Sequence, residues 1–132
     1  MNVRILVVED NTMIANVLAA VLRPMAKYIE LAHSLKEARE KVATGRFNCI
    51  TLDLDLPDSL PEHTLIAIAD LKRLCPCEKV IVVSGTISPA ELAQARKYGA
   101  DGFLHKTDPD FPDKIKLIAA ALRPSILSSY SS

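Results

Sequence analysis

Two patterns of hydrophobic and polar residues alternate along the chain. Short runs that are almost wholly apolar are typical of strands buried on both faces of a sheet, and longer stretches with apolar residues three and four positions apart are typical of amphipathic helices. The apolar runs predict strands at residues 3–8, 28–32, 49–52, 79–84 and 102–105. A stretch with helical spacing follows each of these runs.

The helical stretches have recognisable apolar faces. Pro24 limits the length of the first helix, because proline lacks the backbone N–H that a helix interior needs. Ser34 with Glu37 predicts a capping box at the start of the second helix, which continues to Gly45. The expected apolar faces, in chain order, are Ile14, Val17, Leu18, Val21 and Leu22; Leu35, Ala38 and Val42; Leu65, Ile68, Ala69 and Leu71; Leu92 and Ala95; and Ile115, Ile118, Ala119 and Leu122.

The fourth helix carries start and stop signals of its own. Ser88 and Glu91 predict an N-cap and a capping acid, and Pro89 suits the first turn. Gly99 is expected to stop this helix, and Pro112 to open the last one.

Strands separated by helices predict parallel pairing with right-handed crossovers. Helices then cover both faces of the sheet, which explains why the strands are apolar runs and not alternating ones. The sequence therefore predicts an α/β fold, an open doubly wound parallel sheet of five strands.

The composition agrees with a single globular domain. The chain has 132 residues, and 16 basic and 16 acidic residues give a formal net charge of zero, so bulk attraction to nucleic acid or an anionic membrane is not indicated. No apolar run approaches membrane-spanning length, and Glu9 and Asp10 end the first apolar run too early for a secretory signal. We expect a domain over residues 1–123 and a polar, serine-rich tail or linker remnant over residues 124–132.

The three cysteines indicate no disulfide framework and no metal site. Cys49 falls in a predicted buried strand, and Cys75 and Cys77 flank Pro76 without a CxxC pair or further ligands nearby. Free thiols are the favoured interpretation, and they point to a reducing, cytoplasmic setting.

Polar side chains stand at the carboxyl ends of four of the five predicted strands. In an open parallel sheet these ends lie at one edge, which is where ligands bind. The residues are Glu9 and Asp10 after the first strand, Asp53 and Asp55 after the third, Ser84 followed by Gly85 at the fourth, and Lys106 after the fifth.

Each of these residues has an ordinary explanation when it is taken alone. Asp10 or Asn11 could cap the first helix, Ser84 could be a turn serine, and Lys106 could be a surface lysine. Together they predict more, because clustered carboxylates repel one another and a hard divalent cation such as Mg²⁺ is their natural partner. A cation, a lysine and a hydroxyl are suited to holding a phosphoryl group, and a central Asp53 could attack phosphorus and form an acyl phosphate.

At this point the sequence resembles the receiver domain of two-component response regulators. The resemblance is carried by "VVEDN" (7–11), "LDLDLPD" (52–58), "VVSGT" (82–86) and "GADGFLHK" (99–106), in this order and spacing. It implies a flavodoxin-like (βα)5 fold with strand order 2-1-3-4-5. It also implies a signalling domain that catalyses only its own phosphorylation and dephosphorylation, not a conventional enzyme.

The resemblance implies a role for each residue at the predicted edge. Asp53 matches the phosphoacceptor, Lys106 the family's lysine, and Ser84 the hydroxyl that moves toward the phosphoryl group, with small Gly85 leaving room beside it. Phe103 matches the aromatic whose rotamer changes on phosphorylation. The ligands of Mg²⁺ (or Mn²⁺) would be Asp10, Asp53, Glu9 through metal-bound water, and the main-chain carbonyl of Asp55.

The implied partners are a histidine kinase or phosphotransfer protein and an effector or output domain bound on the face of the fourth helix, fifth strand and fifth helix. We expect no direct binding of nucleic acid or membrane, and a homodimer stays open. The sequence leaves no room for a DNA-binding domain after Leu122, so we expect either a stand-alone receiver or a piece of a longer regulator or hybrid kinase.

The sequence departs from the family pattern at two places. Residues 59–64 contain no glycine, and Thr107 stands where a proline often follows the lysine. A cis bond before a residue other than proline costs about 2.5–4 kcal/mol, so we predict a trans bond between Lys106 and Thr107.

Three alternatives compete with a phosphorylated receiver. A toprim-like Mg²⁺ domain and a haloacid-dehalogenase-like phosphatase both use Asp-x-Asp, but neither explains Ser84 together with Lys106. A pseudo-receiver would keep the fold as an interaction module without signalling by phosphate.

Overall fold

The five predicted strands form one parallel sheet in the order β2-β1-β3-β4-β5. The structure is a computed structural model, and it describes residues 3–74, 79–85 and 87–117. Its strands are β1 (Arg4–Val8), β2 (Tyr28–Ala32), β3 (Cys49–Leu52), β4 (Lys79–Ser84) and β5 (Gly102–His105). The predicted fold and strand order are thus confirmed, with the first strand one residue shorter than expected.

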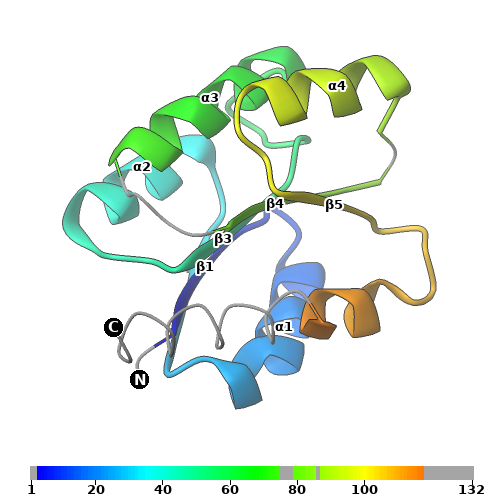
Figure 1. Cartoon of the computed structure of the whole chain (residues 1–132). Coiled ribbons are helices and arrows are strands. Elements are labelled where there is room, and N and C mark those ends of the chain that lie inside the picture. The colour runs from blue at the N-terminus through cyan, green and yellow to red at the C-terminus, as the bar shows by residue number, and fades with distance from the viewer. Residues whose placement is uncertain (1–2, 75–78, 86, 118–132) are drawn as a thin grey trace, which may run out of the picture.

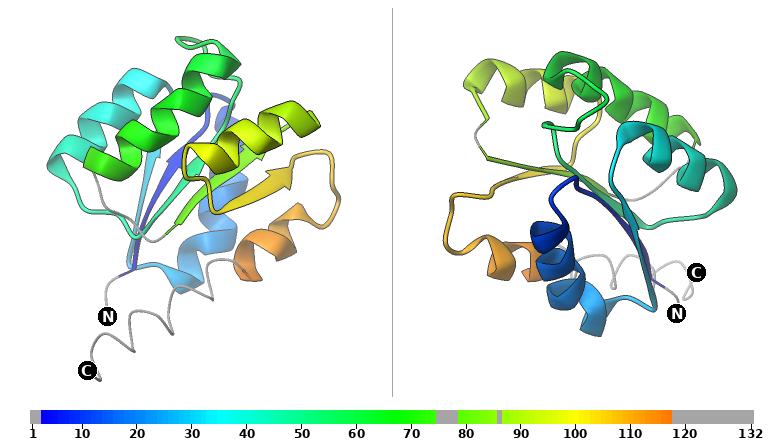
Figure 2. Two further views of the ribbon diagram at one scale, coloured as in Figure 1. Left: turned by 45° about the horizontal axis from the view of Figure 1, so that its top comes forward. Right: turned by 180° about the vertical axis from the view of Figure 1, so that it is seen from behind.

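Helices cover both faces of this sheet. The labelled helices are α1 (Thr12–Leu22), η1 (Arg23–Met25), α2 (Leu35–Thr44), α3 (Pro61–Leu74) and α4 (Pro89–Lys97). Residues 111–117 are also helical. Figures 1 and 2 show α2, α3 and α4 on one face, with α1 and the helical residues 111–117 on the other. The sheet is therefore the middle of three layers.

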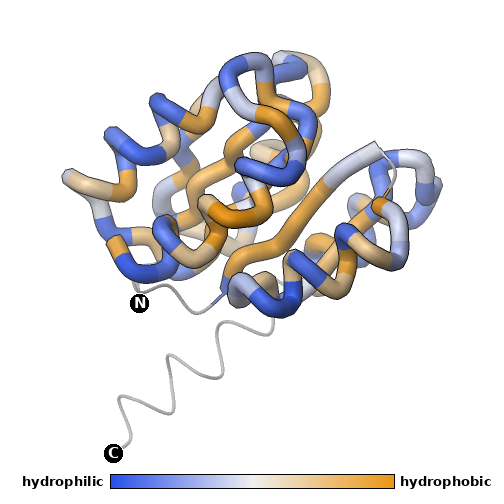
Figure 3. The backbone as a smooth tube through the Cα atoms, turned by 90° about the horizontal axis from the view of Figure 1, so that it is seen from above, coloured by the Kyte–Doolittle hydropathy of each residue, from blue (hydrophilic) through white to orange (hydrophobic). Residues whose placement is uncertain are grey.

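The side chains of the central strands alternate between two hydrophobic cores. In β1, Leu6 and Val8 pack under α2 and α3, whereas Ile5 and Val7 pack toward α1. The pattern repeats in β4, where Val80 and Val82 belong to the first core and Ile81 and Val83 to the second. Figure 3 shows the apolar strands between helices whose outer faces are polar. Two buried faces explain the uninterrupted apolar runs.

The helix boundaries follow the predicted capping chemistry with one correction. Ser88 and Glu91 form a capping box, and Gly99, at φ +110°, follows the end of α4. Ser34 caps α2, since its hydroxyl accepts from Glu37 N. The Glu37 carboxylate does not complete a capping box, however, because it accepts from His33 N and not from the N-cap residue.

Two residues predicted on buried helix faces lie outside them. Val17 is 42% exposed, while the core side of α1 is formed by Ala15, Leu18, Ala19 and Leu22. In α3, Ala69 is exposed, and Ala67 occupies the core beside Ile68. In both helices apolar residues occupy two neighbouring faces, so the hydropathy pattern does not distinguish the buried face from the face beside it. Spacing alone therefore did not fix the rotation of the helix.

Some predictions fall outside the described residues. These are the helix positions Ile118, Ala119 and Leu122, the cysteines Cys75 and Cys77, and the domain boundary at residue 123 with its tail. Cys49 is buried in β3, as expected. No peptide bond of the described residues is cis, so the bond between Lys106 and Thr107 is trans, as predicted.

Candidate functional site

The predicted polar residues meet at the carboxyl edge of the sheet. Parallel pairing of β1 with β3 places Val8 beside Leu52, so Glu9 and Asp53 follow on neighbouring strands. Pairing of β4 with β5 places Ser84 beside His105, directly before Lys106. Glu9, Asp53 and Ser84 are 2%, 3% and 1% exposed, respectively. Buried carboxylates at a strand end require partners.

Lys106 provides a partner for both buried carboxylates. Its ammonium donates a hydrogen bond to Asp53 Oδ2 at 3.0 Å and lies 2.5 Å from Glu9 Oε1. The contact with Glu9 is an ion pair between a cation and a buried carboxylate. The Lys106 side chain is 16% exposed. One positive charge is thus shared between two buried negative charges.

The other carboxylate oxygens are held by main-chain N–H groups. Asp55 N donates to Asp53 Oδ1 at 3.0 Å, and Asn11 N donates to Glu9 Oε2 at 3.0 Å. The main chain of Asp55 therefore contacts the central aspartate, although its side chain is exposed. Asp10 is exposed as well, and Asn11, not Asp10, caps α1.

The pKa values follow from this arrangement. Burial raises the pKa of Glu9, and the charge of Asp53 adds to that effect, while Lys106 and the N–H of Asn11 oppose it. Burial alone would lower the pKa of Lys106, but pairing with Glu9 and Asp53 outweighs burial and raises it above 10.5. Lys106 is therefore a cation at neutral pH, and burial disfavours the charged form of Glu9.

The acid cluster is suited to a hard cation in charge and in donor type. Glu9, Asp10, Asp53 and Asp55 supply oxygen donors, and one lysine leaves an excess of negative charge among them. Among the described residues, no three histidine, cysteine or acidic side chains already converge on one point. Lys106 contacts both buried carboxylates, so a cation that binds there competes with the lysine.

The remaining predicted residues surround this cluster. Ser84 is buried at the end of β4, and its carbonyl accepts from Lys106 N at 2.8 Å. A Cβ added at Gly85 would meet no atom within 4 Å, so there is open space beside the cluster. Phe103 is half-buried against the core, and the guanidinium of Arg96 in α4 lies 5.3 Å from its ring centroid.

Sequence reasoning missed two residues whose contacts connect the loops of the site with the start of α2. His33 Nδ1 lies 3.0 Å from Glu9 O, and Asp58 accepts two main-chain hydrogen bonds from the start of α2. Asp58 lies within the "LDLDLPD" stretch, but nothing in the pattern indicates its partners. Both contacts depend on how separate loops approach one another.

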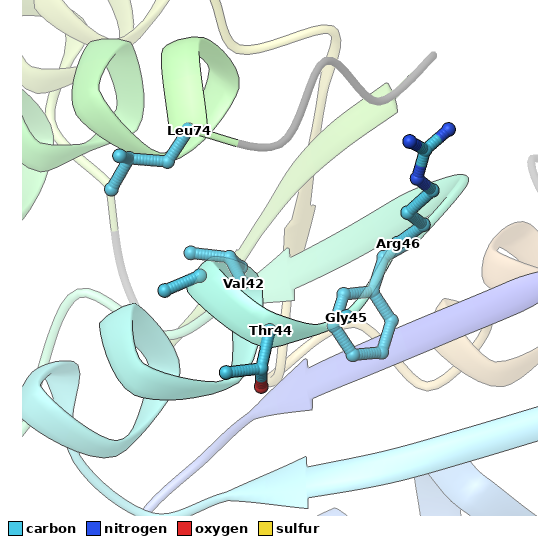
Figure 4. Close-up of a pocket in the computed structure, with 7 residues that line it drawn as sticks. Val42, Thr44, Gly45, Arg46 and Leu74 are labelled. Atoms are coloured by element: carbon cyan, nitrogen blue, oxygen red, sulfur yellow. The ribbon is translucent and has the colours of Figure 1, made fainter.

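Two surface cavities lie away from the acid cluster. One, of about 480 Å³, lies at the other end of α2, lined by Val42, Thr44, Gly45, Arg46 and Leu74 among others (Figure 4). A groove of about 320 Å³ between α3 and α4 is lined by Glu62, Leu65, Ile66, Ala90, Glu91, Gln94 and Tyr98. Neither is lined by a predicted site residue.

Comparison with known proteins points in the same direction. The sequence matches the family model of the response regulator receiver domain over residues 5–118. Among curated protein sequences, none matches this chain closely enough to count as a relative. Within the described residues, every helix is too short or too polar to span a lipid bilayer.

Several solved structures share the fold. A response regulator protein from Burkholderia pseudomallei, solved with a phosphorylated aspartic acid, a calcium ion and citrate, is 31% identical; the match covers 99% of this chain and 74% of that one, with a TM-score of 0.77. A CheY-like receiver domain protein from Methanospirillum hungatei JF-1 is 27% identical, with 95% and 99% covered and a TM-score of 0.78. The Mn²⁺-bound form of another response regulator is 22% identical, with 87% and 90% covered and a TM-score of 0.71, which shows the fold alone.

Proposed function

The chain belongs to the response regulator receiver domain family, and from this membership we propose that Asp53 accepts a phosphoryl group in a Mg²⁺-dependent reaction. Receivers are signalling modules and not conventional enzymes, so the toprim-like and phosphatase alternatives are set aside. The observation that carries the proposal is the environment of Asp53. Its buried carboxylate is fixed by Asp55 N on one oxygen and by Lys106 on the other.

The proposed step is a transfer to a carboxylate oxygen. An oxygen of Asp53 forms a bond to phosphorus, and the bond to the donor breaks, so that the bonding pair leaves with a histidine nitrogen or with acetate. The product is an acyl phosphate on Asp53. The ammonium of Lys106 supports the step by neutralising charge on the entering group, as cations do in phosphoryl transfer.

Mg²⁺ or Mn²⁺ would be held by Glu9, Asp10 and Asp53 together with the main-chain carbonyl of Asp55. When bound, it would supply positive charge to the phosphoryl oxygens. The Burkholderia pseudomallei relative was solved with a calcium ion and a phosphorylated aspartic acid, which supports the same pairing of cation and acceptor here. A histidine kinase or phosphotransfer protein would be the donor.

Mass spectrometry after treatment with acetyl phosphate and Mg²⁺ tests this proposal. The wild-type chain should gain one phosphate, and the gain should disappear without Mg²⁺. Asp53→Asn keeps the shape of the side chain but removes the nucleophilic charge, and it should gain none. Equal phosphorylation of Asp53→Asn would refute the assignment, and a wild-type chain that never gains phosphate would favour the pseudo-receiver.

We further propose that the signal leaves through α4, β5 and the following helix, where an effector or output domain would bind. Ser84 would move toward the phosphoryl group, and Phe103 would turn into the vacated space. The Arg96 guanidinium over the Phe103 ring links this aromatic to α4. Beryllofluoride with Mg²⁺ should therefore shift the amide resonances of residues 90–98 as well as Phe103. A response confined to the acid cluster would contradict this route.

A further inference from the structure

Asp58 joins the loop after β3 to the start of α2. Its Oδ1 accepts from Leu35 N and its Oδ2 from Lys36 N, each at 2.9 Å. Leu35 and Lys36 are 23 and 22 positions away from Asp58 in the sequence, so these bonds join the loop to a helix that is distant along the chain. The same helix start has its own local cap, because Ser34 Oγ accepts from Glu37 N at 3.1 Å. Asp58 therefore accepts from two further N–H groups of the first turn, which Ser34 leaves uncapped, and ties them to the loop after β3.

The start of α2 is also bonded to the loop after β1. Glu9 N donates to Ala32 O at 2.8 Å, and Glu9 O accepts from His33 Nδ1 at 3.0 Å. The carbonyl can only accept, so the proton is on Nδ1. His33 N in turn donates to Glu37 Oε2 at 3.1 Å. Residues 32–36 thus bridge the two loops that carry the acid cluster.

Contacts with the acid cluster, the core and the neighbouring helices hold the loop after β3 in one conformation. Near its start, Asp55 N donates to Asp53 Oδ1. In its middle, Leu56 is buried at 5% exposure in the core beneath α2 and α3. Beyond that point Asp58 is bonded to α2. Farther along, Ser59 Oγ accepts from Thr64 Oγ1 of α3 at 2.8 Å, so Asp58 supplies the hydrogen bonds to α2 and Ser59 the one to α3.

We propose that Asp58 is a positioning residue for the cation site, holding the main chain of Asp55 in place relative to Glu9 through the start of α2. This inference rests on the proposed function, because the cation is the one required for phosphorylation. Asp58 itself is not among the residues that would hold the cation, because both of its carboxylate oxygens are bonded to α2. It acts as supporting residues do around other metal sites, where loss of an outer partner weakens binding.

The charge state of Asp58 agrees with this role. Its slight burial would raise its pKa, but the N–H groups of Leu35 and Lys36 outweigh burial and lower the pKa below 3.8. The side chain is therefore a full double acceptor throughout the neutral range.

The test compares Asp58→Ala with Ser34→Ala. Both variants remove acceptors from the first turn of α2, but only Asp58→Ala disconnects the loop that carries Asp55. The apparent Kd for Mg²⁺ is measured from the amide shifts of Asp10 and Asp55, and thermal unfolding is measured in parallel. We expect Asp58→Ala to raise this Kd by roughly three- to tenfold and Ser34→Ala to change it by less than about twofold. If Asp58→Ala does not fold, Asp58→Asn, which keeps one acceptor oxygen, should give a smaller rise.

The outcomes separate the inference from the proposed function. Equal Kd values for both variants, or an unchanged Kd for Asp58→Ala, would show that Asp58 serves helix stability alone and would overturn the inference. A wild-type chain that binds Mg²⁺ but is never phosphorylated would refute the proposed function, while the Kd comparison would still decide the role of Asp58. A wild-type chain that does not bind Mg²⁺ would overturn both.

Discussion

Removing the Lys106 ammonium should reveal how much the buried acid pair depends on it. In Lys106→Met, Glu9 and Asp53 keep their burial but lose the cation that lies 2.5 Å and 3.0 Å from them. At an effective dielectric constant of 20, these two attractions amount to about 6.6 and 5.5 kcal/mol, most of which the desolvation of the three charges offsets.

The net loss of stability is smaller than these attractions. Breaking a buried ion pair by removing one partner typically costs about 3–5 kcal/mol. Lys106 is 16% exposed, and Glu9 can take up a proton once its partner is gone, so we expect a loss of about 3 kcal/mol at pH 7. Urea unfolding in the absence of divalent cations measures this loss. Lys114→Met is the matched control, because Lys114 pairs with Asp108 at the surface with 51% of its side chain exposed, and its loss should be clearly smaller.

The loss should also depend on pH. The pKa of Glu9 is already above 4.5 in the folded protein, because burial and Asp53 raise it more than Lys106 lowers it. A raised folded-state pKa gives stability that is complete below 4.5 and is lost as pH rises through the folded pKa. Without Lys106 this pKa rises further, so Lys106→Met should lose more stability at pH 8 than at pH 5.

Mg²⁺ should partly restore the variant. At a free concentration of ten times its Kd, a cation that binds only the folded protein raises the free energy of unfolding by about 1.4 kcal/mol. In the wild-type chain the cation competes with Lys106 for Glu9 and Asp53, so the gain in Tm should be larger in Lys106→Met. The reasoning is wrong if Lys106→Met and Lys114→Met lose equal stability, or if Mg²⁺ stabilises the wild type more than the variant.

Three further substitutions test the fold around the site. Leu52 is fully buried beside the acid cluster, so Leu52→Ala leaves a cavity in the core. The free energy of unfolding, measured in urea, should fall by about 2–5 kcal/mol. A loss below about 1 kcal/mol would mean that the core collapses to fill the cavity. Gly99→Ala puts a Cβ at φ +110° and 3.0 Å from Lys72 Cδ, and should lower stability by about 1–3 kcal/mol; no change in Tm would contradict the strained geometry. Ser88→Ala removes the hydroxyl that accepts from Glu91 N and should cost about 1 kcal/mol, seen as faster amide exchange confined to the first turn of α4.

The sheet and its polar edge could be predicted because two simple rules act together. Apolar runs separated by helical stretches imply parallel strands, and parallel strands place their carboxyl ends at one edge. Glu9, Asp53, Ser84 and Lys106 therefore had to lie near one another. The resemblance implied a lysine partner for Asp53, but neither it nor the pattern gave the second contact of Lys106, with Glu9, because side-chain pairing is decided by loop geometry.

The errors in the helices have a related cause. A helix face is assigned from the contrast between apolar and polar positions, and α1 contains no charged residue at all. Val17 was therefore assigned to the buried face, although it is 42% exposed. In α3 the uninterrupted apolar run at residues 65–69 makes Ala67 and Ala69 equally suited to the core, and Ala67 is the buried one. Where contrast is strong, as in α2, the predicted face of Leu35, Ala38 and Val42 is the buried one.

Asp58 shows why a site is larger than its motif. An acid next to Pro57 in a surface loop is, by sequence, one more turn residue. Asp58 matters because it accepts from Leu35 N at the start of α2, 23 positions away in the sequence. His33, which precedes the N-cap of this helix, contacts Glu9 O and so connects the same end of α2 to the loop of Glu9. Pairing of β1 with β3 fixes the bases of the two loops, and α2, which is bonded to both loops beyond the strand ends, adds a second constraint on the separation of Glu9 and Asp55. The precision of the acid cluster would then depend on α2, which carries none of the residues that bind the cation.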